Sequence, residues 1–378
     1  MTASRAARLL DLGQSVWLDF IRRGHLVSGE FDRMLREDGV VGVTSNPTIF
    51  HLAIAQSQDY DAALMERRAG GLQGVPLFES LAVEDIQMAC DRLRPVFEET
   101  AGRDGRVSIE VNPHLAHDTA GTVAEARRLR AAVGRDNVMI KVPATAEGVP
   151  AFRTLTAEGL SINVTLIFSL ARYRQVLDAY LDGLEQRATA GQSLDGIRSV
   201  ASFFVSRVDT RIDPELDAAA ARLPAGSPAR LEVEDLKGRA AIANARLAYA
   251  HFRSVSAGTR FAALAARGAH AQRPLWASTS TKNPAYRDVI YVEELIGPDT
   301  VNTMPPQTLA AFNDHGVIET RIDRDLEEVA TLFERLSKVG IAAEALIDEL
   351  EPQGVLAFQR SFDQLLEALE SKRRELVA

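Results

Sequence analysis

Val138-Met139-Ile140-Lys141-Val142, followed by Pro143-Ala144-Thr145, is a short apolar run of the kind that forms a buried strand. Its penultimate residue is a lysine, and a charged amine is costly to bury. Because burial disfavours the charged form, such a lysine is partly neutral and nucleophilic near neutral pH, as a Schiff-base lysine must be. The alternative is a lysine at a strand end whose side chain reaches back to water. Lys141 is therefore a candidate catalytic residue.

Seven further apolar runs lie along the chain, and most are separated by segments with the spacing of amphipathic helices, such as 119–133 and 170–187. Strands that alternate with helices pair in parallel through βαβ units. Eight strands in such a series predict an α/β fold of the (β/α)8 TIM-barrel type. A doubly wound sheet is the alternative, but no G-x-G-x-x-G follows an early strand. The predicted strands cover residues 16–19, 40–44, 107–111, 138–142, 162–168, 200–205, 274–277 and 301–304.

The 378 residues fit one barrel domain over 1–378 that carries extra helices. The connections 50–106 and 210–273 are each long enough for more than one helix. After Gly316 the sequence is charged and periodic, which predicts a helical C-terminal extension over about 317–378. Its helices are expected at 322–339, 342–350 and 355–378, outside the barrel or over one of its ends.

The composition excludes several classes of protein. A net charge of -9 argues against binding to nucleic acid or to anionic membranes, and no apolar run approaches the roughly 18 residues that span a bilayer. A single cysteine, Cys90, and an N-terminus without a secretory signal predict a cytoplasmic protein. His114 and His117 have a spacing that suggests a metal site, but no further ligand is near them in sequence. We therefore expect hydrogen-bonded loop histidines and no metal.

Polar residues recur on one face of the predicted strands, near their carboxyl ends. Side chains two apart on a strand share a face, and in a small barrel one face points into the interior. Barrel enzymes keep their catalytic groups at the carboxyl ends of the strands. Each polar residue alone is explained by a satisfied buried hydrogen bond, but together they predict a catalytic site. They are Asp19, Thr44, Asn46, Ser108, Glu110, Lys141, Asn163, Thr165 and Ser202, the last aligned with Phe204.

These residues have a chemical logic. A neutral Lys141 amine attacks a ketone to give a carbinolamine and then an iminium ion, which draws electrons from a breaking carbon–carbon bond. Dehydration of the carbinolamine requires proton transfer, which Glu110 can supply through a water held with Thr165. Asp19 is the candidate base for cleavage; its alternative role is a helix N-cap before residues 20–23. Two asparagines can hydrogen-bond substrate hydroxyls, namely Asn46 and Asn163.

Five ordered motifs together resemble the transaldolase family, over roughly residues 14–316. The resemblance implies a class I aldolase barrel without cofactor or metal. It would move a dihydroxyacetone unit from sedoheptulose 7-phosphate or fructose 6-phosphate to glyceraldehyde 3-phosphate or erythrose 4-phosphate in the non-oxidative pentose phosphate pathway. The motifs are Gly42-Val43-Thr44-Ser45-Asn46-Pro47-Thr48, Ser108-Ile109-Glu110-Val111, Met139-Ile140-Lys141-Val142-Pro143-Ala144-Thr145, Ile162-Asn163-Val164-Thr165-Leu166-Ile167-Phe168-Ser169 and Ser202-Phe203-Phe204-Val205-Ser206-Arg207-Val208-Asp209.

The resemblance also implies roles for particular residues. Arg207 matches a phosphate-binding arginine, with a surface ion pair to Asp209 as its alternative. A second such arginine, which many relatives have after the seventh strand, is missing here, and Lys282 is the candidate to replace it. Long connections and the C-terminal extension suggest the longer-chain bacterial-type subgroup. The remaining matches are Lys141 as the Schiff-base lysine, Glu110 and Thr165 as the acid-base and water-holding pair, Asp19 at bond cleavage, and Thr44, Asn46, Asn163, Ser202 and Phe204 around the substrate.

Two other functions stay open. One is a class I aldolase that releases free dihydroxyacetone; the related fructose 6-phosphate aldolases use a tyrosine in the acid-base role, where this chain has Glu110. The other is a non-catalytic barrel that binds sugar phosphates. The partners we expect are small sugar phosphates, and both a monomer and a homodimer are compatible with the sequence.

Overall fold

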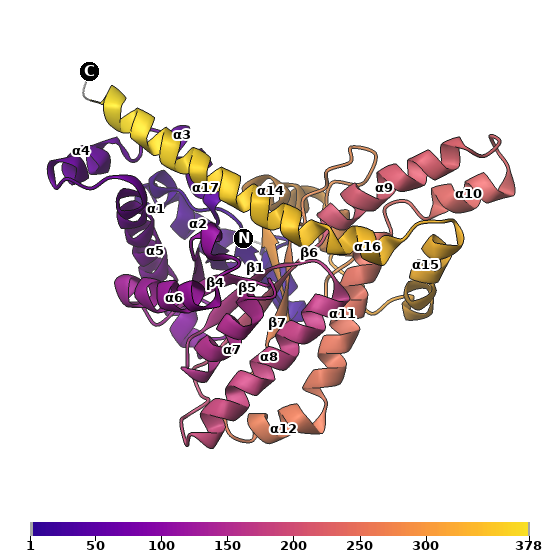
Figure 1. Ribbon diagram of the computed structural model, residues 1–378, viewed down its shortest axis with the longest axis horizontal. Helices are drawn as coiled ribbons and strands as arrows, with labels where there is room; N and C mark the ends of the chain where they lie inside the picture. Colours follow the sequence, from indigo (N-terminus) through magenta and orange to yellow (C-terminus); the bar gives the residue numbers. More distant parts are fainter. Residues whose placement is uncertain (1–2, 377–378) are drawn as a thin grey trace.

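The computed structural model describes residues 3–376 and contains a closed barrel of eight parallel strands in chain order (Figure 1). Strand β8 pairs with β1, which closes the barrel and excludes the doubly wound sheet. All eight predicted strands are confirmed, with ends that differ by at most two residues. They are β1 Gln14–Leu18, β2 Val40–Thr44, β3 Arg106–Glu110, β4 Val138–Pro143, β5 Ile162–Ile167, β6 Ser199–Phe204, β7 Arg273–Ala277 and β8 Thr300–Met304.

Helices surround the barrel, and local sequence signals fix where they begin and end. The predicted helix over 119–133 is α6, Thr119–Val133. Asp118 caps its first turn by accepting a hydrogen bond from the Gly121 N–H, and Gly134 ends it in the left-handed conformation. The other helices before the extension are α1 Arg23–Ser28, α2 Glu30–Glu37, α3 Pro47–Ala55, α4 Asp61–Ala69, α5 Gly74–Glu99, α7 Gly148–Ala157, α8 Leu170–Thr189, α9 Ser206–Ala221, α10 Pro228–Asp235, α11 Ala240–Ser256, α12 Thr259–Ala265, α13 Ile290–Glu293 and α14 Pro306–His315, with 3-10 turns η1 Ala7–Leu12 and η2 Pro113–Leu115.

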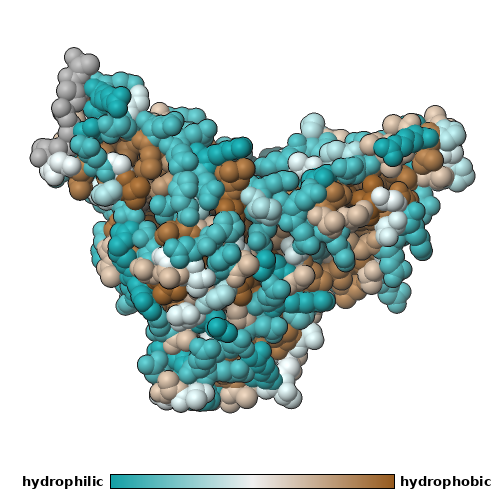
Figure 2. Space-filling model, viewed as in Figure 1, coloured by the Kyte–Doolittle hydropathy of each residue, from teal (hydrophilic) through white to brown (hydrophobic). Residues whose placement is uncertain are grey.

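The two long connections carry several helices each, as predicted. The first holds α3, α4 and α5, and the second holds α9 to α12. In Figure 1, α9 and α10 project to one side as an arm, next to α15 (Leu326–Lys338). Figure 2 shows a largely hydrophilic face with hydrophobic patches, one of them in the region of this arm. Within residues 3–376, no helix is long and apolar enough to cross a membrane.

The C-terminal extension is helical, but its last helix begins five residues earlier than predicted. It consists of α15, α16 (Ala343–Asp348) and α17 (Leu350–Glu375). Pro352 and Gly354 are typical of a loop, yet a proline is tolerated in the first turn of a helix. Gly354 lies against the side chains of Leu166 and Phe168, which a Cβ there would meet at 3.1 and 3.3 Å. A glycine therefore lets α17 pack closely on the carboxyl end of β5 (Figure 1).

Candidate active site

Lys141 is buried at the carboxyl end of β4, and it faces a carboxylate. Its Nζ lies 3.4 Å from Oε2 of Glu110, and both side chains are about 95% buried, with exposed fractions of 5% and 6%. The two residues are direct neighbours in the β3–β4 register, so the alternation of side chains brings them to the same face. The alternative of a lysine that reaches water is therefore wrong.

Burial raises the pKa of Glu110, and the charge of Asp19 raises it further, while Lys141 opposes the change. The Lys141 ammonium also donates to the backbone oxygen of Ser45 at 3.0 Å. A buried amine beside a carboxyl group of raised proton affinity can pass it a proton and become a nucleophile.

A chain of hydrogen bonds fixes the residues next to this pair. Asn163 is the register neighbour of Lys141 on β5. Its Nδ2 donates to Oγ of Ser108 at 3.1 Å, and its Oδ1 accepts from Oγ of Ser202 at 2.7 Å. All three side chains are buried. Asn163 therefore keeps one N–H for a ligand, and the Ser202 oxygen keeps its acceptor capacity.

Asp19 follows β1 and is held by the neighbouring strand. Its Oδ1 accepts a hydrogen bond from Oγ1 of Thr44 at 2.7 Å, and its backbone N–H donates to the Met304 carbonyl at 2.9 Å. The next helix, α1, starts only at Arg23, after Arg22 in the N-cap position. Asp19 is therefore not a helix N-cap. Its carboxylate lies close enough to Glu110 to raise the pKa of Glu110.

Thr165 and Asn46 lie on either side of the lysine in the barrel order. Oγ1 of Thr165 is buried and has no hydrogen-bond partner within residues 3–376, so it can bind a water molecule or a ligand. Asn46 is the residue that caps α3, because its Oδ1 accepts from the Ile49 N–H at 2.9 Å. This cap occupies Oδ1 of Asn46 and leaves its Nδ2 amide group available as a donor.

Two cations stand at the carboxyl ends of β6 and β7. The guanidinium of Arg207, in the first turn of α9, lies 5.7 Å from the centre of the Phe204 ring. Lys282 is exposed as a whole residue, but partial burial of its amine lowers its pKa, as does the charge of Arg207, against an opposing effect of Asp19. Neither cation forms an ion pair with a carboxylate in the described part of the chain. An anion is the partner that this arrangement favours.

The alternative role of Arg207, an ion pair with Asp209, is wrong. Asp209 is buried and accepts hydrogen bonds from the Ala241 N–H at 2.7 Å and from the Tyr291 hydroxyl at 2.8 Å. Burial raises the pKa of Asp209 to about 7. Asp209 therefore ties α9 to α11 and α13, and Arg207 is left for the site.

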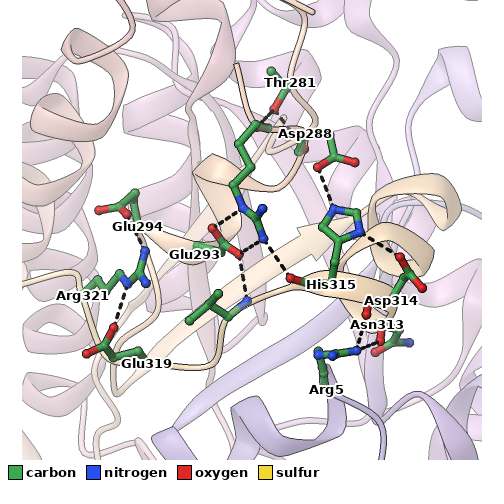
Figure 3. Close-up of polar contacts among 12 residues, drawn as sticks. Arg5, Thr281, Asp288, Glu293, Glu294, Asn313, Asp314, His315, Glu319 and Arg321 are labelled. Carbon is green, nitrogen blue, oxygen red and sulfur yellow. Dashed lines mark hydrogen bonds and ion pairs between the residues drawn. The ribbon is translucent and has the colours of Figure 1, made fainter. Parts of the chain in front are cut away.

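The loop that carries Lys282 is held in place by polar contacts (Figure 3). Oγ1 of Thr281 donates to the Asp288 carbonyl at 2.9 Å, and the Asp288 carboxylate contacts Nε2 of His315 at 2.9 Å. Figure 3 shows these residues on the loop and at the end of α14. Lys282 lies in this segment, and its Nζ donates to Oγ of Ser280 at 2.6 Å.

Three groups that contact or support the candidate site were not predicted from the sequence. The Ser45 carbonyl accepts a hydrogen bond from Lys141, and the Ser45 hydroxyl donates to the Ser108 carbonyl at 2.8 Å. Phe168 packs against Phe204 with ring centres 5.0 Å apart, and Gly354 of α17 packs against Phe168. A carbonyl group and a distant helix leave no pattern in the local sequence, so only the fold reveals them.

The two histidines do not form a metal site. Nε2 of His114 contacts Oδ1 of Asp363 at 2.8 Å, and Nδ1 of His117 contacts Oε2 of Glu147 at 3.1 Å. They are hydrogen-bonded surface residues, as expected. Among the residues that the structure describes, no group of three or more His, Cys, Asp or Glu is placed to hold a metal ion.

A closed (β/α)8 barrel with a buried lysine and carboxyl pair at the carboxyl ends of its strands is the arrangement expected of a class I aldolase, an enzyme that forms an imine with a carbonyl substrate. Comparison with known proteins narrows this class. Residues 16–369 match the family described as transaldolase/fructose-6-phosphate aldolase. The chain belongs to this family.

Several relatives are similar over almost the whole chain. Transaldolase 1 of Streptomyces coelicolor is 47% identical over 369 residues, which are 97% of this chain and 94% of the relative. The transaldolase of Thermobifida fusca is 48% identical over 361 residues, 95% of this chain and 96% of the relative. The transaldolase of Trichodesmium erythraeum is 43% identical over 378 residues, 100% of this chain and 99% of the relative.

Proposed function

We propose that this protein is a transaldolase that transfers a dihydroxyacetone unit from a ketose phosphate to an aldose phosphate through an imine on Lys141. The single observation that carries the mechanism is the buried contact of 3.4 Å between Lys141 Nζ and Glu110 Oε2. Family membership and the transaldolase relatives support the reaction. Sugar phosphates would be its partners, in the cytoplasm and in the non-oxidative pentose phosphate pathway.

Glu110 would first act as a base and then as an acid. It takes a proton from the Lys141 ammonium, and the neutral amine attacks the ketone carbon to give a carbinolamine. The protonated Glu110 then delivers a proton to the carbinolamine hydroxyl, directly or through a water bound to Thr165, and water leaves as the iminium forms. Burial raises the pKa of Glu110. This supports the first step because the carboxylate is a stronger base, and the second because Glu110 keeps its proton until the carbinolamine hydroxyl accepts it.

Asp19 would assist cleavage of the carbon–carbon bond. It takes the proton from the hydroxyl on the leaving fragment, the bond breaks, and its electrons move toward the iminium nitrogen to give an enamine. The hydrogen bond of 2.7 Å from Thr44 supports this role because it fixes the carboxylate. Asn46, Asn163 and Ser202 would bind the substrate hydroxyls.

Arg207 and Lys282 would bind the substrate phosphate, together with the amino end of α9 and beside Phe204. We expect Arg207→Ala to raise KM for fructose 6-phosphate by about tenfold to a hundredfold with a small change in kcat, because a charge-assisted contact is lost in substrate and transition state alike. Lys282→Ala should act in the same direction. Steady-state kinetics with fructose 6-phosphate and with unphosphorylated fructose measure the effect. An equal loss of kcat/KM with fructose 6-phosphate and with fructose would contradict a role in phosphate binding.

Trapping of the imine tests the proposal. Incubation with fructose 6-phosphate, reduction with borohydride and peptide mass analysis are expected to place a dihydroxyacetone-sized adduct on Lys141. No adduct with fructose 6-phosphate or sedoheptulose 7-phosphate would exclude the aldolase mechanism and favour a non-catalytic sugar-phosphate-binding barrel.

A second assay separates transaldolase from fructose 6-phosphate aldolase. With an acceptor aldose phosphate, a transaldolase yields a new ketose phosphate and little free dihydroxyacetone. Free dihydroxyacetone as the main product, with or without the acceptor, would favour the aldolase. Glu110 supports transfer, because the related aldolases use a tyrosine in this role.

A further inference from the structure

A cavity separate from the candidate active site lies at the end of the barrel opposite Lys141. It has a volume of about 560 Å³, which is typical of small-molecule sites. Its walls are the first residues of β3, β6 and β7, the last turns of α11, and α12. Helix α12 lies in the lower part of Figure 1. None of the residues proposed for the transaldolase reaction lines it.

Arginines dominate the lining, and carboxylates do not balance them. Asp299 is the one carboxylate among the described lining residues, and its Oδ1 pairs with Arg103 at 3.1 Å. Arg273 pairs with the buried Asp104 at 2.9 Å. The lining arginines are Arg103, Arg106, Arg198, Arg253 and Arg273.

Three of these arginines form no ion pair within residues 3–376. Arg198 donates to the Ala101 carbonyl at 2.9 Å, and Arg253 contacts the Tyr249 hydroxyl at 3.4 Å. Arg198 also donates to the Ile197 carbonyl at 3.2 Å. All these partners are neutral, so among the described side chains none of the three guanidinium groups is in direct contact with a carboxylate, although Asp104, Asp195 and Asp299 lie close enough to act on them.

Arg106 is the most unusual of the three, because it is 1% exposed. Its Nε donates to the Gly102 carbonyl at 2.7 Å and its guanidinium lies 5.1 Å from the centre of the Phe97 ring, but its Nη1 has no hydrogen-bond partner in the described chain. Burial lowers the pKa of Arg106 to about 9, with contributions from the charges of Arg198 and Arg273 and an opposing effect of Asp104. A buried N–H without a hydrogen-bond partner is unfavourable, and so is repulsion between neighbouring arginines. A bound anion would accept the hydrogen bond and reduce the repulsion.

We propose that this cavity is a binding site for a phosphorylated small molecule that carries two or more negative charges. A guanidinium group can donate two parallel hydrogen bonds to two phosphate oxygens, and three such groups without a direct carboxylate contact suit more than one anionic oxygen. Phe252 and Phe261 supply apolar surface for the carbon part of the ligand. The site is separate from Arg207 and Lys282 and does not depend on the proposed reaction.

Isothermal titration with inorganic pyrophosphate tests the site. The full-length protein carries Arg207→Ala and Lys282→Ala throughout, so that the phosphate position at the other end of the barrel does not contribute. This protein is expected to bind pyrophosphate with a stoichiometry of one. Addition of Arg198→Ala and Arg253→Ala should weaken binding by about tenfold or more, as expected for the loss of charge-assisted hydrogen bonds.

The matched control is Arg222→Ala, an exposed arginine at the end of α9, for which the expected affinity is unchanged. Arg253 is also exposed, so Arg253→Ala alone gives the same direction of change if the double substitution disturbs the fold. The site is excluded if the background protein does not bind pyrophosphate, if the cavity substitutions leave binding unchanged, or if Arg222→Ala weakens it equally.

Discussion

Lys141→Met is expected to abolish imine formation and to lower kcat on the order of 10⁴-fold or more, because no other described residue stands at the site with a buried amine beside a carboxyl group. Methionine keeps the length and the apolar stem of the side chain but lacks the nucleophile. Transfer assays and borohydride trapping measure the two effects.

The variant should still fold. Removal of the lysine takes away the charge that opposes the raised pKa of Glu110, so the pKa rises further and the carboxyl group is buried in its neutral form. Circular dichroism and thermal unfolding check this point. Lys282→Ala is the control for loss of a lysine, since at saturating fructose 6-phosphate it should still give an adduct on Lys141. Full turnover by the Lys141→Met protein, or trapping at another lysine, would contradict the mechanism.

Much of the fold follows from the sequence because the strands of a closed parallel barrel are buried on both faces and appear as continuous apolar runs. The start of the last helix does not follow from the local sequence, because Pro352 and Gly354 favour a loop, whereas α17 begins at Leu350. Packing of Gly354 against Leu166 and Phe168 overrides that preference. Such contacts join segments almost two hundred residues apart.

The candidate site follows from the sequence where side chains alternate regularly between the two faces of a strand. Glu110, Lys141 and Asn163 are register neighbours on three consecutive strands, so alternation along each strand places them together. This alternation no longer predicts the direction of a side chain at the ends of the strands. Leu166 has a φ of 60° where the register of β5 shifts. Asn46 lies beyond β2 and caps α3. There the direction of a side chain depends on the local turn.

The arginine cavity could not be predicted. Arg106, Arg198 and Arg253 come from three distant segments, and each alone is typical of a surface residue. Only closure of the barrel brings them to one end.

Glu110→Gln is expected to lower kcat by about 10² to 10⁴-fold, the usual contribution of a positioned general acid or base. Glutamine has the same shape, but it takes no proton from Lys141 and gives none to the carbinolamine. The matched control is Glu125→Gln, because Glu125 lines the same small cavity as Glu110 and also has a raised pKa. Glu125 is paired with Arg128 at 2.8 Å on α6, outside the barrel, and its substitution should leave the reaction unchanged.

The pH dependence gives a stricter test of Glu110. The free enzyme needs Glu110 ionised to accept the lysine proton, so kcat/KM should fall as the pH drops through the pKa of this residue. Because burial raises that pKa, the midpoint of the fall should lie above the ordinary glutamate value of about 4.3. This acidic limb should be lost or displaced in Glu110→Gln and retained in Glu125→Gln. An identical limb in the wild type and in Glu110→Gln would show that another group controls it, and Glu110 would then be left with the role of holding Lys141 in place.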